Sequence, residues 1–255
     1  MNALNHSLAG KAAMVTGGRR GIGKAIALAF AQAGADVAVC DIATEDGQLM
    51  SVAGEIQKMG KRSLAVQGDT SKRRDVEKMV GRVLREFGTI DILLNNAGTA
   101  APGPLLELTD EAWDRVMNVN LKGYYLCAQT VGKGMVERKK GVIVCIASQY
   151  AFKAASGMGV YCVSKAGVVM LARVLARELG NDGIRVNAIA PGLVKTDLSR
   201  NDWMDPDIRT QREAATPLGR LAETSDLVGT ALFLASDASA YITGHTIVVD
   251  GGEIA

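Results

Sequence analysis

The chain has 255 residues, enough for one large domain or two small ones. A hydrophobic fraction of 48% allows a large core, and a net charge of only +2 argues against a general affinity for nucleic acid or for an anionic membrane. The N-terminal residues MNALNHSLAGK lack the features of a signal peptide, and no apolar stretch approaches the roughly 18 residues that cross a bilayer. We therefore expect a cytoplasmic protein without nucleic-acid or membrane partners.

The cysteines and histidines are too dispersed to predict a metal site. The two histidines, His6 and His245, are far apart in the sequence, which also argues against a Ser-His-Asp triad. The cysteines show no C-x-x-C spacing, in keeping with a reducing compartment; they are Cys40, Cys127, Cys145 and Cys162. We expect no bound metal.

Short runs of apolar or β-branched residues alternate with helical patterns along the chain. The longest helical patterns are 109–138 and 157–179. Strands that are apolar throughout and separated by helices indicate a parallel sheet with helices on both faces. No linker or repeat divides the sequence, so we predict a single doubly wound α/β domain over residues 1–255, with seven parallel strands. The predicted strands are 12–15, 36–40, 62–67, 90–95, 141–147, 184–190 and 245–250.

The least regular segment is 193–217, which contains Pro206 and Pro217 together with Trp203 and Met204. It follows the end of a predicted strand, where open α/β sheets bind their ligands. We expect this segment to be a substrate lid, and a long surface loop is the alternative.

The first predicted strand continues directly into a glycine-rich turn, TGGRRGIG (16–23), and then into a helix. The glycines at 17, 21 and 23 are spaced G-x-x-x-G-x-G. Glycine allows a tight turn and a close approach of the backbone to a pyrophosphate, and the first N–H groups of the following helix can bind it. This strand–turn–helix context predicts a dinucleotide site.

Two side chains favour different dinucleotides. Asp41 ends the second predicted strand, where a carboxylate can accept hydrogen bonds from the adenosine ribose of NAD and repels the 2′-phosphate of NADP. Arg20, just before Gly21, could instead pair with that phosphate. Because Asp41 would occupy the ribose pocket itself, NAD(H) is favoured and NADP(H) stays an alternative.

Further motifs follow the glycine turn in a fixed order. They are GDTS (68–71), NNAG (95–98), NVN (118–120), Ser148, YCVSK (161–165) and PGLVKT (191–196). In this combination the sequence resembles the short-chain dehydrogenase/reductase family over essentially its whole length. The resemblance implies a Rossmann-type domain, an NAD(P)-dependent oxidoreductase acting on a CH–OH group, and a homotetramer that packs the helices at 109–138 and 157–179 against a neighbour.

The resemblance also implies roles for individual residues. The catalytic tetrad would be Asn120, Ser148, Tyr161 and Lys165, with Lys165 also binding the nicotinamide ribose. Thr196 would hold the nicotinamide carboxamide. The implied cofactor-binding set is Gly17, Arg20, Gly21, Ile22, Gly23, Asp41, Asp69, Asn95, Ala97, Gly98, Tyr161, Lys165, Pro191, Gly192, Val194 and Thr196.

The Tyr and Lys of YCVSK suit proton transfer. They are four residues apart in a predicted helix, so Tyr161 and Lys165 lie on one face. A free phenol has a pKa of about 10, which a nearby ammonium ion and an oxidised nicotinamide would lower. Tyr161 could then donate a proton to a carbonyl during reduction or accept one from an alcohol during oxidation, with Ser148 hydrogen-bonded to the same oxygen.

The substrate itself is less constrained. Gln149 and Tyr150 suit the hydroxyl groups of a polyol or sugar acid, whereas Met158 and Leu193 suit an acyl chain. The main prediction is NAD-dependent oxidation of a polyol, sugar acid or other secondary alcohol. The alternatives are NADPH-dependent reduction of a 3-oxoacyl thioester of acyl carrier protein or CoA, and a non-catalytic dinucleotide sensor or scaffold. The residues expected around the substrate are Ser148, Gln149, Tyr150, Met158, Leu193 and Trp203.

Overall fold

A parallel sheet of seven strands forms the centre of the computed structural model, which describes residues 6–255. The strand order is β3-β2-β1-β4-β5-β6-β7, and each pairing is parallel. The predicted fold class is confirmed, and every predicted strand is present with its bounds displaced by at most two residues. The strands are β1 (Ala12–Thr16), β2 (Asp36–Asp41), β3 (Ser63–Gln67), β4 (Ile92–Asn95), β5 (Gly141–Ile146), β6 (Ile184–Pro191) and β7 (Thr246–Val249).

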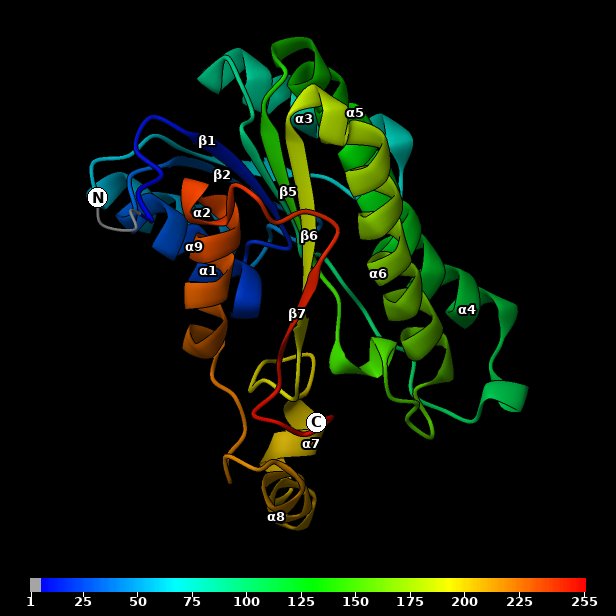
Figure 1. The fold of residues 1–255 in the computed structure, drawn as a ribbon. Helices are drawn as coiled ribbons and strands as arrows, with labels where there is room; N and C mark the ends of the chain where they lie inside the picture. Colours follow the sequence, from blue (N-terminus) through cyan, green and yellow to red (C-terminus); the bar gives the residue numbers. More distant parts are fainter. Residues whose placement is uncertain (1–5) are drawn as a thin grey trace.

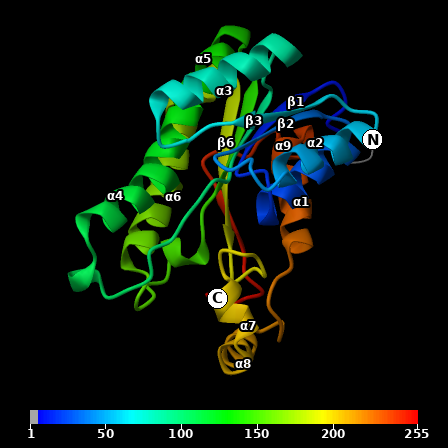
Figure 2. The same cartoon turned by 180° about the vertical axis from the view of Figure 1, so that it is seen from behind.

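Helices cover both faces of this sheet. Successive residues of a strand point to opposite faces, so Met14 and Val15 of β1 belong to two different apolar cores. On one face lie α1 (Gly21–Gln32), α2 (Gln48–Lys58) and α9 (Val228–Ala235), and on the other α3 (Arg73–Phe87), α5 (Gly123–Arg138) and α6 (Gly159–Leu179) (Figure 1 and Figure 2).

The helical pattern predicted at 109–138 is interrupted around Asn120. α4 (Asp110–Met117) is followed by a π-helical turn at Asn118–Lys122, and α5 begins at Gly123. Such single wide turns inside helices often occur at functional sites. Here the turn brings the fully buried Asn120 side chain against the loop that follows β4.

One long apolar helix is α6, which with the turn after it spans 24 residues, Gly159–Asp182, and by length and composition alone could cross a membrane. This finding corrects the expectation that no apolar stretch approaches that length. Val168, Val169 and Ala172 of α6 are nevertheless packed in the core of the domain. A core helix meets the same length criterion, so this feature is weak evidence for a membrane segment.

The segment 193–217 is more regular than expected. It contains α7 (Arg200–Met204) and α8 (Pro206–Ala215), which project beyond the carboxyl ends of β6 and β7, close to the C-terminus (Figure 1). Pro206 occupies the first turn of α8, and the Asp205 side chain accepts hydrogen bonds from the N–H groups of Asp207 and Ile208 at 2.9 and 3.1 Å.

Candidate active site

A cavity of about 720 Å³ runs along the carboxyl ends of the strands. Its walls come from the glycine turn after β1, from the ends of β2 to β6, and from the segment that leads into α7 and α8. It therefore spans the junction of β1 and β4, where the strand order reverses and open α/β sheets bind ligands.

The glycine turn leaves space that side chains would fill. Gly17 and Gly21 have positive φ values of 64° and 56°. A Cβ on Gly23 would clash with the Gly17 carbonyl and would lie 2.5 Å from Asn96 Nδ2. Asn96 Nδ2 donates to the carbonyl oxygens of Thr16 and Gly17 at 2.9 and 3.0 Å, so the turn is tied to the end of β4. This open backbone cradle fits the pyrophosphate of a dinucleotide.

At the adenosine end, Asp41 shares its surroundings with an arginine that sequence reasoning passed over. Arg19 Nε lies 3.6 Å from Asp41 Oδ1, and Arg19 Nη1 pairs with Asp46. Arg20, the arginine expected to compete for a 2′-phosphate, is instead paired with Asp197 at 2.8 Å. The Arg19 Nε is buried and has no hydrogen-bond partner within residues 6–255. Of the two arginines in the glycine turn, Arg19 therefore lies close to Asp41, whereas Arg20 is paired with Asp197.

At the opposite end, Ser148, Tyr161 and Lys165 converge. The Ser148 hydroxyl is within hydrogen-bonding reach of the Tyr161 hydroxyl, and Lys165 Nζ lies 5.6 Å from the Tyr161 ring centroid. Lys165 is 3% exposed, and its Nζ donates to the Ile146 carbonyl at 2.8 Å. The Tyr124 hydroxyl donates to the same carbonyl at 3.1 Å, which holds the end of β5 in place.

The pKa values in this cluster are set mainly by burial. Burial raises the pKa of Tyr161 to about 12, and the hydrogen bond with Ser148 opposes that rise. Burial also lowers the pKa of Lys165 to about 8. The protein alone therefore does not favour the phenolate, contrary to the expectation for the Tyr–Lys pair. An oxidised nicotinamide ring beside the phenol would supply the further positive charge that the phenolate needs.

Asn120 connects the tetrad to the loop after β4. Its Nδ2 donates to the Thr99 carbonyl and to Ser164 Oγ at 2.9 and 3.0 Å, and its Oδ1 accepts from the Thr99 N–H at 2.8 Å. Gly98 is close enough that a Cβ there would lie 3.8 Å from Lys165 Nζ. Asn120 thus fixes the wall of the cavity next to Lys165.

Sequence comparison agrees with this geometry. A family model described as enoyl-(acyl carrier protein) reductase matches residues 17–253. A 3-oxoacyl-[acyl-carrier-protein] reductase of Staphylococcus epidermidis is 39% identical over 95% of this chain and 98% of its own length. The chain belongs to the short-chain dehydrogenase/reductase family. It is therefore an oxidoreductase that uses a nicotinamide cofactor on a CH–OH or carbonyl group.

Other members of the short-chain dehydrogenase/reductase family are as similar. An L-rhamnose 1-dehydrogenase (NAD(P)(+)) of Sphingomonas is 39% identical, over 96% of both chains. Among solved structures, a gluconate 5-dehydrogenase of Burkholderia cenocepacia in complex with NADP and tartrate superimposes with a TM-score of 0.94 at 32% identity, covering 99% of this chain and 98% of that one.

The cluster can perform the hydride chemistry of the short-chain dehydrogenase/reductase family. A nicotinamide cofactor bound here would supply the hydride acceptor or donor for this chemistry. Tyr161 is placed where it could take the hydroxyl proton in oxidation and donate it in reduction. Ser148 is placed to hydrogen-bond the same oxygen. A Lys165 ammonium 5.6 Å from the ring centroid could support a negative charge on the phenol.

Most residues assigned by sequence line the cavity, and four do not: Asn95, Gly23, Trp203 and Asn120, whose amide is engaged by the loop after β4. Asn95 is fully buried and its Nδ2 donates to the Tyr124 carbonyl at 3.2 Å, so Asn96 takes its place at the cavity wall. Gly23 contributes to the turn because it lacks a Cβ, which would clash with the Gly17 carbonyl. Trp203 is not in the wall, because its Nε1 donates to the Thr196 carbonyl at 2.8 Å. The assigned residues in the wall are Gly17, Arg20, Gly21, Ile22, Asp41, Asp69, Ala97, Gly98, Ser148, Gln149, Tyr150, Met158, Tyr161, Lys165, Pro191, Gly192, Leu193, Val194 and Thr196.

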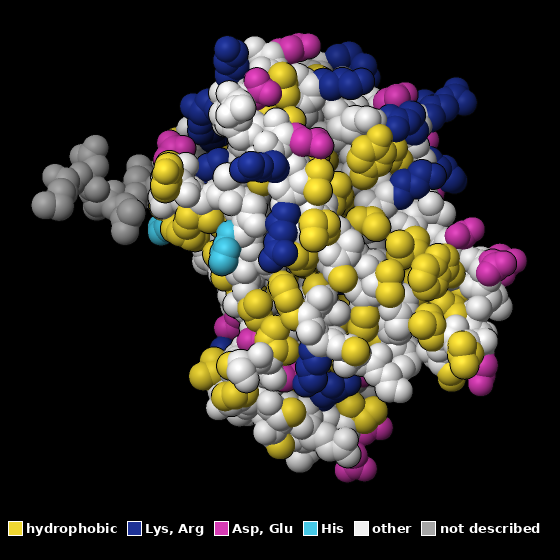
Figure 3. Space-filling model, turned by 45° about the vertical axis from the view of Figure 1, so that its right-hand side comes forward, with side chains coloured by type: hydrophobic (Ala, Val, Ile, Leu, Met, Phe, Trp, Pro, Cys, Tyr) yellow, Lys and Arg dark blue, Asp and Glu magenta, His cyan; other side chains and the backbone are white. Residues whose placement is uncertain are grey.

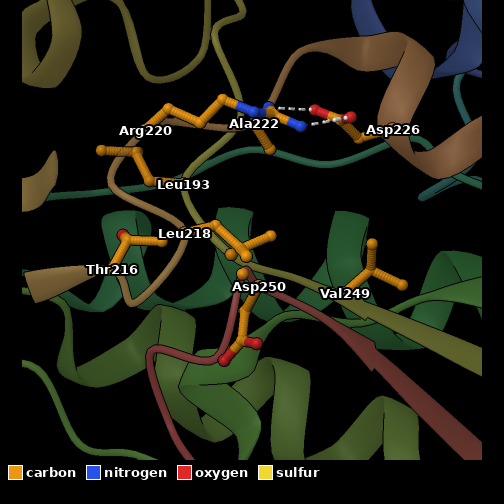
Figure 4. A pocket seen from close by; sticks show the side chains of 10 residues that line it. Leu193, Thr216, Leu218, Arg220, Ala222, Asp226, Val249 and Asp250 are labelled. Atoms are coloured by element: carbon orange, nitrogen blue, oxygen red, sulfur yellow. Dashed lines mark hydrogen bonds and ion pairs between the residues drawn. The ribbon is translucent and has the colours of Figure 1, made fainter.

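A second cavity, of about 180 Å³, lies behind Leu193, between β7 and the segment after α8. Figure 4 shows Arg220 and Asp226 pointing toward one another on its upper side, joined by two hydrogen bonds of 2.7 and 2.9 Å. The Asp250 carboxylate accepts from the N–H groups of Gly252 and Ile254. The charged side chains that line this cavity are thus already partnered.

Proposed function

We propose that the protein is an NAD-dependent dehydrogenase that oxidises a secondary alcohol group of a polyol or sugar acid. The observation that carries this proposal is the buried side-chain oxygen of Gln149, which lines the cavity beside Ser148 and has no hydrogen-bond partner in the described part of the chain. An unpaired buried acceptor is costly, and a hydroxyl group of the substrate would satisfy it. The name of the gluconate 5-dehydrogenase supports a sugar acid, and that of the rhamnose 1-dehydrogenase supports a sugar-like substrate more generally.

The proposed preference for NAD(H) rests on Asp41 and on the engagement of both arginines. Arg19 is held by Asp41 and Asp46, and Arg20 by Asp197. A 2′-phosphate would have to displace one of these ion pairs and approach Asp41. NADP(H) is the alternative cofactor, since the Burkholderia structure is a complex with NADP. Arg19 could bind its 2′-phosphate if the side chain turned away from Asp46.

We expect the protein to bind NADH at least about tenfold more tightly than NADPH, a difference of about 1.4 kcal/mol. Asp41→Asn should narrow or reverse this difference, because the repulsion of a 2′-phosphate is lost while the ion pair that restrains Arg19 weakens. Fluorescence titrations with NADH and with NADPH at one salt concentration give the dissociation constants of the wild-type protein and of Asp41→Asn. Asp36→Asn, at the other end of β2, is the matched control. A wild-type preference for NADPH would contradict the proposal.

Reduction of a 3-oxoacyl thioester with NADPH is the second candidate. It is favoured by the identity to the Staphylococcus reductase and by the apolar Met158 and Leu193 in the cavity wall. NAD⁺-dependent oxidation of polyols and sugar acids, compared with NADPH-dependent reduction of a 3-oxoacyl thioester, separates the two candidates. A cytoplasmic location is part of either proposal.

We further propose a homotetramer in which α5 and α6 meet a second copy. Hydrophobic side chains are spread over the middle of the face that carries α6, with Lys and Arg side chains above them (Figure 3). The exposed apolar residues there include Tyr125 of α5 and Val163, Met170 and Val174 of α6.

Met170→Glu should therefore dissociate the assembly, because it places a charge in the centre of an apolar contact. Light scattering coupled to size-exclusion chromatography measures the mass. Met50→Glu is the control, since Met50 of α2 is comparably exposed, at 63% against 55%, on the other side of the sheet. A wild-type mass of one chain would contradict the proposal.

A further inference from the structure

One cationic side chain at the substrate end of the large cavity is not engaged by an acidic group. The cationic residues in the cavity wall are Arg19, Arg20, Arg115, Lys165 and Arg212. Arg19 and Arg20 are ion-paired near the glycine turn, and Lys165 donates to a main-chain carbonyl. Arg115 of α4 is exposed to solvent. Arg212 of α8 is partly buried and has no carboxylate within ion-pair distance among residues 6–255.

Arg212 lies close to the reacting groups through Tyr150. Burial raises the pKa of Tyr150, whereas the charge of Arg212 and a hydrogen bond with it act in the opposite direction. The rings of Tyr150 and Tyr161 are in edge-to-face contact, with centroids 6.5 Å apart. One small molecule can therefore contact Arg212 with one of its groups while its reacting oxygen is hydrogen-bonded to Tyr161.

We propose that Arg212 anchors a carboxylate of the substrate, so that the enzyme acts on hydroxy acids in preference to neutral polyols. The inference rests on the proposed function and narrows its substrate class. The planar guanidinium matches a carboxylate with two parallel hydrogen bonds, and a half-buried site strengthens them. The neighbouring Gln149 oxygen accepts a substrate hydroxyl, so the site recognises both features of a sugar acid.

Nearby acidic groups limit where this carboxylate can lie. Glu253 is nearly buried and is paired with Lys153 at 3.4 Å, so its charge is largely compensated. Asp202 of α7 also lines the cavity and has no ion-pair partner among the described residues. Besides burial, Asp202 and Glu253 both raise the pKa of Tyr150, so both oppose an anion beside it, whereas Arg212 favours one. Asp202→Asn should accordingly lower KM for the acid.

The test compares an aldonate with the alditol of the same carbon skeleton, using the full-length enzyme and saturating NAD⁺. We expect kcat/KM for the aldonate to exceed that for the alditol by at least about tenfold. Arg212→Gln should remove this advantage mainly by raising KM for the aldonate, and should change KM for the alditol by a much smaller factor. Arg212→Lys should retain part of it, because the charge remains and the paired hydrogen bonds are lost.

Arg209→Gln is the matched control, since Arg209 is an exposed arginine of the same helix. Binding of tartrate to the NADH complex, measured by calorimetry, provides a readout independent of turnover and should weaken in Arg212→Gln alone. Two outcomes overturn the inference and leave the proposed function in place. One is equal kcat/KM of the wild-type enzyme for the aldonate and the alditol. The other is a folded Arg212→Gln protein with unchanged KM for the aldonate and unchanged affinity for tartrate. Oxidation of neither substrate, with NADPH-dependent reduction of a 3-oxoacyl thioester, overturns both.

Discussion

Replacing Tyr161 with Phe is expected to reduce turnover by at least about a hundredfold, the low end for acid–base catalysis, while cofactor affinity stays nearly unchanged. The substitution removes one hydroxyl group and leaves the ring that packs against Tyr150 at 6.5 Å. Without the phenol, the hydroxyl proton of the substrate loses the acceptor that we propose for it. Steady-state turnover at saturating NAD⁺ and NADH binding by fluorescence separate the two effects.

The matched control is Tyr241→Phe, because Tyr241 is fully exposed and takes no part in the cavity. It should retain wild-type turnover. If Tyr161→Phe also turned over at a near-normal rate, Tyr161 would not be the proton donor and acceptor, and another group in the cavity would have to replace it.

Replacing Lys165 with Met should lower kcat/KM for alcohol oxidation at least about a hundredfold and should move the remaining activity to higher pH by at least about one unit. Lys165 Nζ lies 5.6 Å from the Tyr161 ring centroid, and a cation at such a distance lowers the pKa of a phenol. We expect its removal to raise the pKa of Tyr161, which burial already raises, so that the phenolate needed for oxidation forms only at higher pH. The measurement is the pH dependence of kcat/KM for both proteins.

Lys78→Met is the control, since Lys78 is an exposed lysine of α3. A merely structural role for Lys165 would lower activity without moving the pH profile. An unchanged profile in a folded Lys165→Met protein would therefore show that the ammonium does not act on Tyr161.

Much of the fold and of the reacting centre was predictable from local sequence. A buried parallel strand needs apolar residues on both faces, and this requirement made β1 to β7 visible as continuous apolar runs. The Tyr161–Lys165 pair was visible because a helix places residues four apart on one face. The glycine turn was visible because its backbone conformation and clearance exclude side chains at Gly17, Gly21 and Gly23.

The structure departs from the sequence-based assignments where one residue or one side-chain conformation decides whether a residue reaches the cavity. Asn95 and Asn96 are neighbours at the end of β4, and consecutive residues of a strand point to opposite sides, so one enters the core and the other the cavity. Trp203 was expected at the substrate because it lies in the lid segment. Its indole N–H instead satisfies a main-chain carbonyl at Thr196, a contact that no local pattern announces.

The sequence by itself determined the doubly wound sheet, and it predicted the dinucleotide site and the Ser148–Tyr161–Lys165 chemistry, because each depends on periodicity or on residues close together along the chain. Only the tertiary structure decided which charges are free to bind a ligand. Arg20 is engaged by Asp197, which lies 177 residues away, Arg19 is engaged by Asp46, and Arg212 is brought to Tyr150 by a helix that follows β6. Ion pairing depends on distance in space and on burial, and neither can be read from the order of the residues.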